Sequence, residues 1–361
     1  MIACSPGRWT AALAAFALNA APATAQQIDF SGSALADAMP LGSRSGDPTI
    51  DMPAGQRLIS AFGERPVFSP DGTKIAFIGS SYGDAFEYDL RSGRIRNLTR
   101  HMPHQGFLRV HYLNDGSFIL AGPHVPAATR EDTRAKTIEL FWMDASATMP
   151  AVRLGVTIFE GVATSRRSNR IAWSEITPKG AGMTGATGTV VRTGTVAIAG
   201  GSARLTDVDT IVTTTDCRVE AQDFLPGDRG LTMPCYRFGG SKGGITTEVV
   251  SVDFATRRLT TYRTPPGLYG EIEGIFPDGK RTLVECSGDR SAGMDLCVLD
   301  LKPVDPRYTR ITRIMDYGRW KYGNPVVGPT GRLIAAQVGS ADVIDAGVGQ
   351  GIVLIDVPEA F

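Results

Sequence analysis

A tight-turn motif recurs along most of the chain, and this internal repeat constrains the fold more than any other feature of the sequence. Each copy is a turn rich in Pro, Asp or Gly that leads into a short apolar segment. Such turns join the two strands of a hairpin. Clear copies begin at Ser69, Asn114, Pro277 and Pro329, and weaker copies occupy 165–173 and 225–233. The chain therefore contains six copies of one hairpin-forming unit.

Two further markers follow the turns in a fixed order. The first is an apolar segment that ends in Asp, with copies at Asp89, Asp144, Asp253, Asp300 and Asp356. The second is a short segment with Arg before Leu or Ile, with copies at Arg153, Arg204, Arg258 and Arg310. One unit thus has four short antiparallel strands and cannot bury both of its faces alone. We predict an all-β fold, a six-bladed β-propeller with four-stranded antiparallel blades.

The last unit lacks its fourth strand, because only the residues VPEAF follow Asp356. The missing marker occurs at the other end of the propeller, as Arg57 followed by Leu58. We therefore expect residues 56–60 to supply the closing strand of the last blade, which would remove two exposed sheet edges. This interpretation assigns 56–361 to the propeller and 26–55 to an N-terminal extension.

Residues 1–25 have the pattern of a secretory signal peptide. Arg8 precedes an Ala/Leu/Phe run, and Ala23-Thr24-Ala25 is a small-x-small cleavage site. The apolar run is too short to span a bilayer, so we expect a periplasmic or secreted protein with no membrane span. Lys and Arg total 37, as do Asp and Glu, so no excess charge attracts nucleic acid.

Four cysteines remain after the signal peptide, which in an exported chain suggests two disulfides, although four cysteines permit three pairings. Cys217 and Cys235 flank the hairpin turn of blade four, and Cys286 and Cys297 lie in the second and third strands of blade five. Partners across a hairpin come close enough for a disulfide. We therefore expect the pairs 217–235 and 286–297.

All four histidines fall in blade two. His101 and His104 lie in the connection between blades, and His124 lies in the loop after the second strand. Both kinds of loop open on the same face of a propeller, so these three could hold a divalent metal or act as acid and base. The alternative is that they are ordinary surface histidines. His111 precedes the turn and is expected to be packed.

The same face should carry several aromatic residues. Tyr317, Arg319 and Trp320 lie between blades five and six, Tyr82 lies in the matching loop of blade one, and Tyr269 lies in the preceding blade connection. Exposed aromatic side chains beside Arg favour the binding of a peptide, a sugar or a protein surface. The alternative for Trp320 is packing over the adjacent blade.

Two segments, ERPVFSPDGTKIAF (64–77) and GRIRNLTRH (93–101), resemble the WD-like repeats of the TolB-type propeller family. The resemblance covers roughly 56–357 and implies the architecture more than an activity, because such blades serve in many proteins. TolB also carries an N-terminal α/β domain, for which residues 26–55 are too short. The resemblance therefore extends to the propeller only.

No nucleophile elbow, HExxH, P-loop or paired-carboxylate motif occurs in the sequence. We therefore expect a monomeric, non-catalytic propeller without a cofactor, which binds a protein or glycan partner on its loop face. The alternative is a propeller enzyme, a polysaccharide lyase or hydrolase, that uses His101, His104 and His124. Some propeller polysaccharide lyases use histidine-held metal in this general way.

Overall fold

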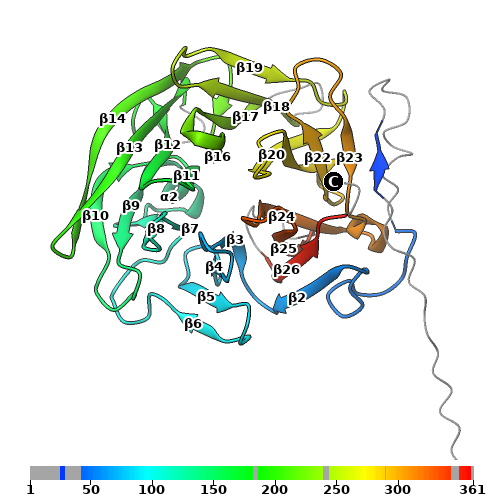
Figure 1. Ribbon diagram of the computed structural model, residues 1–361, viewed down its shortest axis with the longest axis horizontal. Coiled ribbons are helices and arrows are strands. Elements are labelled where there is room, and N and C mark those ends of the chain that lie inside the picture. The colour runs from blue at the N-terminus through cyan, green and yellow to red at the C-terminus, as the bar shows by residue number, and fades with distance from the viewer. Residues whose placement is uncertain are drawn as a thin grey trace, which may run out of the picture.

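The computed structural model describes residues 25–28, 42–181, 186–238, 244–288, 290–342 and 349–358. Six antiparallel sheets surround a central axis as the blades of a propeller (Figure 1). The predicted fold class is confirmed. Residues 1–24 of the expected signal peptide lie outside the described residues.

From the innermost strand outward, blade one comprises β3 (Glu64–Phe68), β4 (Lys74–Ile78), β5 (Ala85–Asp89) and β6 (Ile95–Asn97). Blade two comprises β7 (Arg109–Tyr112), β8 (Phe118–Pro123), β9 (Ile138–Met143) and β10 (Val152–Thr157), with helix α2 (Arg130–Lys136) between β8 and β9. Blade three comprises β11 (Val162–Thr164), β12 (Arg170–Thr177), β13 (Gly188–Ala199) and β14 (Ser202–Thr214).

In blade four the inner strand is split into two short pieces. They are β15 (Arg218–Val219) and β16 (Asp223–Phe224), and both pair with β17 (Gly230–Phe238), which is followed by β18 (Ile245–Asp253) and β19 (Leu259–Tyr262). Blade five comprises β20 (Tyr269–Ile275), β21 (Arg281–Ser287), β22 (Asp295–Asp300) and β23 (Tyr308–Arg310). Blade six comprises β24 (Trp320–Val327), β25 (Leu333–Ser340), β26 (Gly351–Asp356) and β2 (Gln56–Ser60). Two 3₁₀ helices, η1 (Pro226–Asp228) and η2 (Ile314–Tyr317), lie in connections.

The ring closes as expected. Strand β2 pairs antiparallel with β26, with Gln56 opposite Ile355 and Arg57 opposite Leu354. The first strand of the propeller therefore completes its last blade, and Figure 1 shows the two strands side by side. A further strand, β1 (Gln26–Gln27), adds a fifth strand to blade five by pairing with β23. The sequence interpretation did not include this strand.

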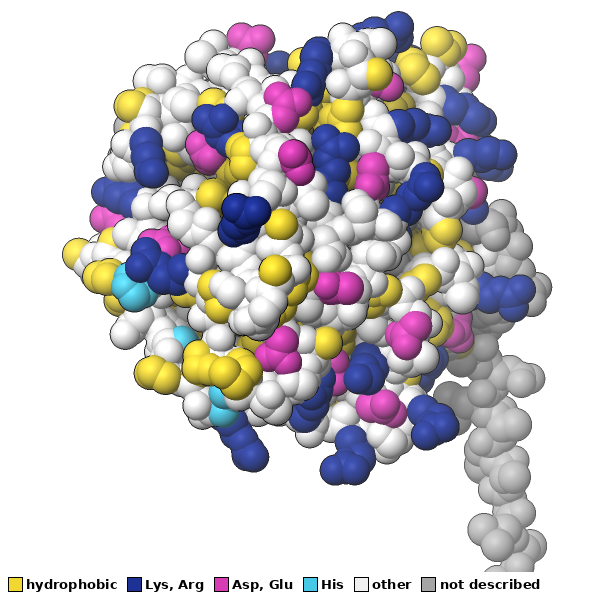
Figure 2. Space-filling view, turned by 60° about the vertical axis from the view of Figure 1, so that its left-hand side comes forward, with side chains coloured by type: hydrophobic (Ala, Val, Ile, Leu, Met, Phe, Trp, Pro, Cys, Tyr) yellow, Lys and Arg dark blue, Asp and Glu magenta, His cyan; other side chains and the backbone are white. Residues whose placement is uncertain are grey.

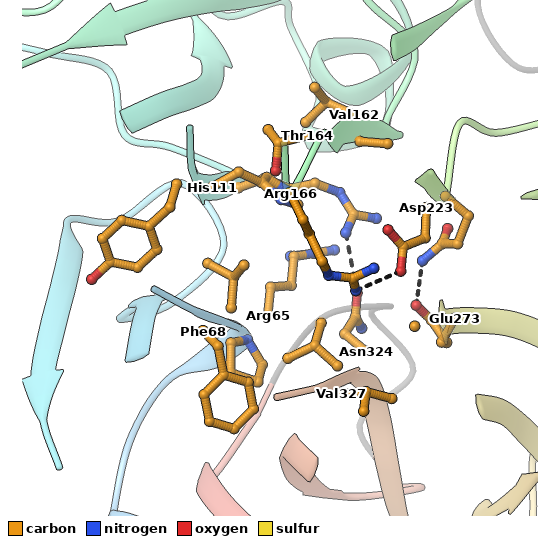
Figure 3. Close-up of a pocket in the computed structure, with 18 of the residues that line it drawn as sticks. Arg65, Phe68, His111, Val162, Thr164, Arg166, Asp223, Glu273, Asn324 and Val327 are labelled. Atoms are coloured by element: carbon orange, nitrogen blue, oxygen red, sulfur yellow. Dashed lines mark hydrogen bonds and ion pairs between the residues drawn. The ribbon is translucent and has the colours of Figure 1, made fainter. Parts of the chain in front are cut away.

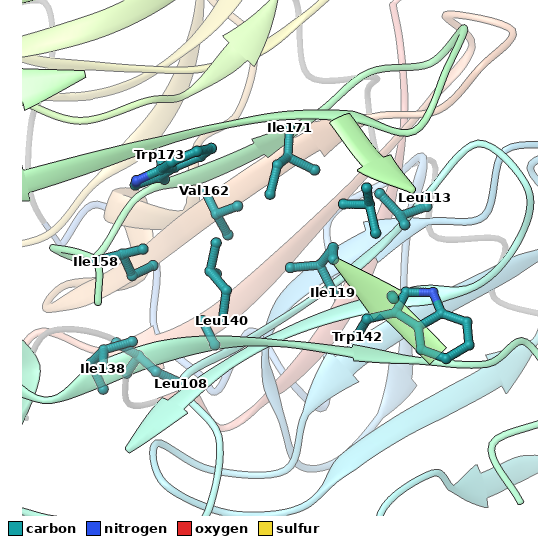
Figure 4. Close-up of a cluster of buried hydrophobic side chains, with 13 residues drawn as sticks. Leu108, Leu113, Ile119, Ile138, Leu140, Trp142, Ile158, Val162, Ile171 and Trp173 are labelled. Atoms are coloured by element: carbon teal, nitrogen blue, oxygen red, sulfur yellow. The ribbon is translucent and has the colours of Figure 1, made fainter. Parts of the chain in front are cut away.

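The core lies between neighbouring blades. Alternate residues of each strand point to opposite faces of its sheet, so each blade can pack against two neighbours. Figure 4 shows one such interface, in which Leu140 of blade two faces Val162 and Trp173 of blade three. The indole N–H of Trp173 donates to Glu175 at 2.9 Å, so its buried polar atom is satisfied.

The repeat markers have the local roles that their residue types predict. The Asp71, Asp115 and Asp278 carboxylates accept backbone N–H groups two residues further on, at 2.9–3.0 Å. Among the strand-end residues, Asp253 accepts the N–H of Thr256 at 2.8 Å. These aspartates therefore stabilise turns.

The four cysteines form the two expected pairs. The Cα atoms of Cys217 and Cys235 are 5.5 Å apart, and those of Cys286 and Cys297 are 5.8 Å apart. Both distances fall in the range of a disulfide. Within the described part of the chain, no helix has the length and apolar character that crossing a membrane requires.

Candidate functional site

The innermost strands of the blades surround an axial channel with a cavity at each end. We call the first the loop-face cavity, because it lies on the side of the loops that join second and third strands. Its volume is about 280 Å³, and helix α2 and the β17–β18 hairpin contribute to its rim. The turn-face cavity, of about 310 Å³, lies beside the turns that join first and second strands. Arg65, Arg109 and Asn324 line both cavities and mark their junction.

Three residues that line the loop-face cavity have an unusual backbone. Arg65, Glu160 and Asn324 have φ values of 52°, 51° and 45°, in the left-handed region that non-glycine residues rarely adopt. The pairing of β3 with β4 shifts register next to Arg65, and the pairing of β24 with β25 shifts register next to Asn324, as at a β-bulge. Strained backbone of this kind collects at functional sites, and here it directs polar side chains into the channel.

Cationic side chains form one wall of the channel. The Arg65 side chain is buried, and its Nη1 donates to Glu64 at 3.3 Å and to Ser81 at 3.0 Å, while its Nε has no hydrogen-bond partner. Burial, and then the charge of Arg109, lower the pKa of Arg65 to about 9. Arg134, on α2, pairs with Glu160 and also has an unpartnered, buried Nε.

Arg109 has only neutral partners among the described residues. Its Nε donates to the backbone carbonyl of Glu160 at 3.0 Å, and its Nη1 donates to the amide oxygen of Asn324 at 3.4 Å. A carboxylate partner would normally compensate a guanidinium in such a position. The junction of the two cavities therefore carries positive charge that is only partly neutralised.

Carboxyl groups of blades four and five form the opposite wall. Burial, followed by the charge of Glu271, raises the pKa of both Glu220 and Glu285 to about 7. Burial and the neighbouring Glu285 also raise the pKa of Glu273. Tyr236 and Tyr269 both donate hydrogen bonds to Glu271. The loop-face cavity thus carries both charges, with the arginines of blades one and two on one side and the glutamates on the other, where Arg218, Arg290 and Lys321 also lie.

Three of these glutamates have the spacing of metal ligands. One carboxylate oxygen from each of Glu271, Glu273 and Glu285 lies within 4.8 Å of the other two. Each carboxylate already accepts a hydrogen bond from the protein, from tyrosines at Glu271, Gln222 at Glu273 and the N–H of Asn324 at Glu285. We assign no metal to this cluster.

The structure does not bring the three loop histidines together as ligands. His101 lies with Nε2 3.1 Å from the Met149 carbonyl, whereas Nε2 of His104 is 2.9 Å from Asp84. His124 is exposed beyond the end of β8. In the described part of the chain, no group of three ligand atoms within 4.8 Å includes a histidine, and Figure 2 shows histidines at separate points of one surface. Different local hydrogen bonds fix His101 and His104 in separate positions.

The aromatic residues expected on the loop face also differ in their positions. Tyr269 is buried in β20, not exposed in a blade connection, and it lines the loop-face cavity. Tyr82 donates to the Arg130 carbonyl at 3.1 Å, and the Arg130 guanidinium lies 5.5 Å from its ring. Trp320 begins β24 and packs, partly buried, on the core between blades five and six.

Tyr317 and Arg319 are occupied by contacts within the chain. The Tyr317 hydroxyl donates to the Asp51 carbonyl at 3.2 Å, and Arg319 pairs with Asp342. Of the five expected binding residues, Tyr269 lines the loop-face cavity and the other four are not among its lining residues. Their role in binding remains a prediction.

The sequence interpretation missed the channel arginines, although a repeat signal for them exists. In blades one, two and six, a backbone carbonyl at the start of the turn between the first and second strands accepts the N–H that closes this turn. Arg65 lies four residues before the accepting residue of blade one, Ser69, and Arg109 lies four residues before that of blade two, Leu113. Asn324 occupies the equivalent position before Gly328. A comparison of this one repeat position would have placed all three on the channel.

No protein-family model and no curated protein matches the sequence. The structure is similar to TolB from Acinetobacter baumannii, with 9% identity, 84% of this chain and 64% of that chain covered, and a TM-score of 0.50. It is similar to an oligogalacturonate lyase in complex with manganese (12% identity, 84% and 93% covered, TM-score 0.50). It is also similar to hydrazine synthase from Kuenenia stuttgartiensis (12% identity, 82% and 96% covered, TM-score 0.50). Similarities at these identities concern the fold alone. The protein has a TolB-like six-bladed propeller fold.

Proposed function

We propose that this protein is an exported, non-catalytic propeller that binds a protein partner on its loop face, with a segment of the partner in the loop-face cavity. The observation that carries the proposal is the bipolar lining of this cavity. Arg65, Arg109 and Arg134 line it together with Glu220 and Glu271, and Arg218, Arg290 and Lys321 lie beside the glutamates. A lining with both charges complements a ligand that carries both charges.

A peptide segment fits these walls better than a neutral glycan does. A peptide presents ammonium or guanidinium groups together with carboxylates, whereas a neutral glycan offers no charge to either wall. The rim supplies an apolar contact as well, because Phe238 is 47% exposed and lines the cavity. The Arg218 guanidinium lies 4.5 Å from the Phe238 ring, an arrangement typical of binding surfaces.

Export is supported by the cysteines. Two cysteine pairs at disulfide distance fit an oxidising compartment. The signal-peptide pattern of residues 1–25 points the same way.

The test is selection of peptides on the immobilised mature protein. Peptides displayed with free charged side chains are selected against the native protein and, in parallel, against the Arg134→Gln and Glu271→Gln variants. We expect enriched peptides to carry both acidic and basic residues and to bind each variant about tenfold or more weakly, because each substitution removes one charge-assisted contact. Equal binding to the native protein and both variants would contradict the proposal.

An enzyme is the second candidate, and one observation favours it. Carboxyl groups with a pKa of about 7, such as those of Glu220 and Glu285, are suited to general acid–base work at neutral pH. An oligogalacturonate lyase shares the fold. Incubation with oligogalacturonate, with and without manganese, and measurement of the ultraviolet absorbance of an unsaturated product tests this candidate. Turnover that Glu220→Gln abolishes would replace the binding proposal.

A further inference from the structure

The turn-face cavity has a lining of a different character from the loop-face cavity. Figure 3 shows Phe68, Val162 and Val327 around a space toward which Arg65 extends. The apolar wall continues through further prolines and aliphatic residues, namely Pro66, Val67, Pro70, Ala163, Ala221 and Pro329. A volume of about 310 Å³ is enough for one small organic molecule.

Most polar groups on this wall carry no free negative charge. Burial, followed by the charge of Arg109, lowers the pKa of His111 to about 3, so the imidazole is neutral. The raised pKa of Glu273, which burial and Glu285 cause, favours its neutral form. Asp223 is occupied by Arg166 at 2.8 Å and by the backbone N–H of Ile275 at 2.8 Å.

The inner end of the cavity is cationic. Arg65 is 4% exposed, and its Nε has no hydrogen-bond partner. Arg109 contacts only the neutral oxygens of Glu160 and Asn324 within the described part of the chain. A buried guanidinium with an unused N–H loses the hydrogen bond that water would give it, and an anionic oxygen would restore that bond.

We propose that the turn-face cavity binds a small amphipathic carboxylate. Its apolar body lies against Phe68, Val162 and Val327, and its carboxylate accepts hydrogen bonds from Arg65 and Arg109. This site goes beyond the proposed partner binding, since it lies at the other end of the channel.

Octanoate is the probe, with octanamide as its neutral counterpart of the same shape. Isothermal titration of the mature protein should give saturable octanoate binding, and octanamide should bind about tenfold or more weakly, because a neutral amide loses the charge-assisted bonds. Arg109→Gln should weaken octanoate binding to a similar extent.

A second variant keeps the test independent of the buried arginines. Thr164 lines the turn-face cavity and is only half-buried, so Thr164→Phe can fill the cavity without disturbing the core. We expect Thr164→Phe to abolish octanoate binding and the control Thr164→Ser to retain it, with thermal unfolding showing that both are folded.

Three results would overturn the proposal. They are equal binding of octanamide and octanoate, unchanged binding by Thr164→Phe, and no saturable binding up to about 10 mM octanoate. Binding of a peptide through its free C-terminal carboxylate, without binding of octanoate, would likewise reject a small ligand. The peptide selection uses Arg134 and Glu271, which line only the loop-face cavity, so the two proposals can fail separately.

Discussion

Replacement of Glu220 by Gln should make the protein more stable at alkaline pH. Glu220 is 4% exposed and lies in the break between β15 and β16, where burial and then Glu271 raise its pKa from the usual 4.5 to about 7. Below about pH 4.5 the Glu220 carboxyl is neutral in both the folded and the unfolded protein, so its burial does not lower the free energy of unfolding. Between pH 4.5 and about 7 the unfolded chain loses this proton while the folded protein keeps it, so stability falls as pH rises.

Above about pH 7 the folded protein carries the buried charge, and the full cost applies. The difference in pKa corresponds to about 3 kcal/mol of unfolding free energy. A Gln side chain has nearly the same shape and no charge. Glu220→Gln should therefore be on the order of 3 kcal/mol more stable than the native protein at about pH 8, and within about 0.5 kcal/mol of it at about pH 4.

Urea denaturation followed by tryptophan fluorescence at both pH values measures this difference. The control is Glu131→Gln, because Glu131 lines the same cavity but is exposed. This control should change stability by about 0.5 kcal/mol or less at either pH. A stabilisation by Glu220→Gln that is equal at the two pH values, or a loss of stability at about pH 8, would refute the reasoning.

Three further predictions concern the fold. Deletion of 26–62 removes the strand that closes the ring, so we expect aggregation in size-exclusion chromatography; a stable monomer would contradict the closure. The double variant Cys286→Ala, Cys297→Ala should lose about 2–4 kcal/mol of unfolding free energy in urea, because the cross-link no longer restricts the unfolded chain. An unchanged urea midpoint would mean that the cross-link is not formed. Trp320→Ala should lower stability by about 1–3 kcal/mol because the indole packs on the core, and an unchanged melting temperature with weakened peptide binding would instead support its role as a binding anchor.

The architecture followed from the sequence because its signals are local and repeated. Each of the three markers, the turn, the strand that ends in Asp and the strand with Arg before Leu, involves only a few adjacent residues. Because the four-stranded unit occurs six times, its sheets bury both of their faces by packing against one another in a ring. The closing strand at Gln56–Ser60 was found by counting strands, and the Cys286–Cys297 pair by its place in a hairpin. The short pairing of β1 with β23 carried no such repeated marker and was missed.

The channel was decided by the tertiary structure. Arg109 and Asn324 are 215 positions apart in sequence, and although they occupy equivalent repeat positions, only the folded ring brings their side chains into contact. The direction of side chains also depends on tertiary context, because the left-handed backbone of Arg65 turns its guanidinium into the channel while the Asp84 carboxylate holds His104 elsewhere. Residue type and loop position suggested a histidine site, and the folded ring gives His101 and His104 different hydrogen-bond partners. The burial and the charge neighbours of the arginines and glutamates in the channel likewise exist only in the folded ring.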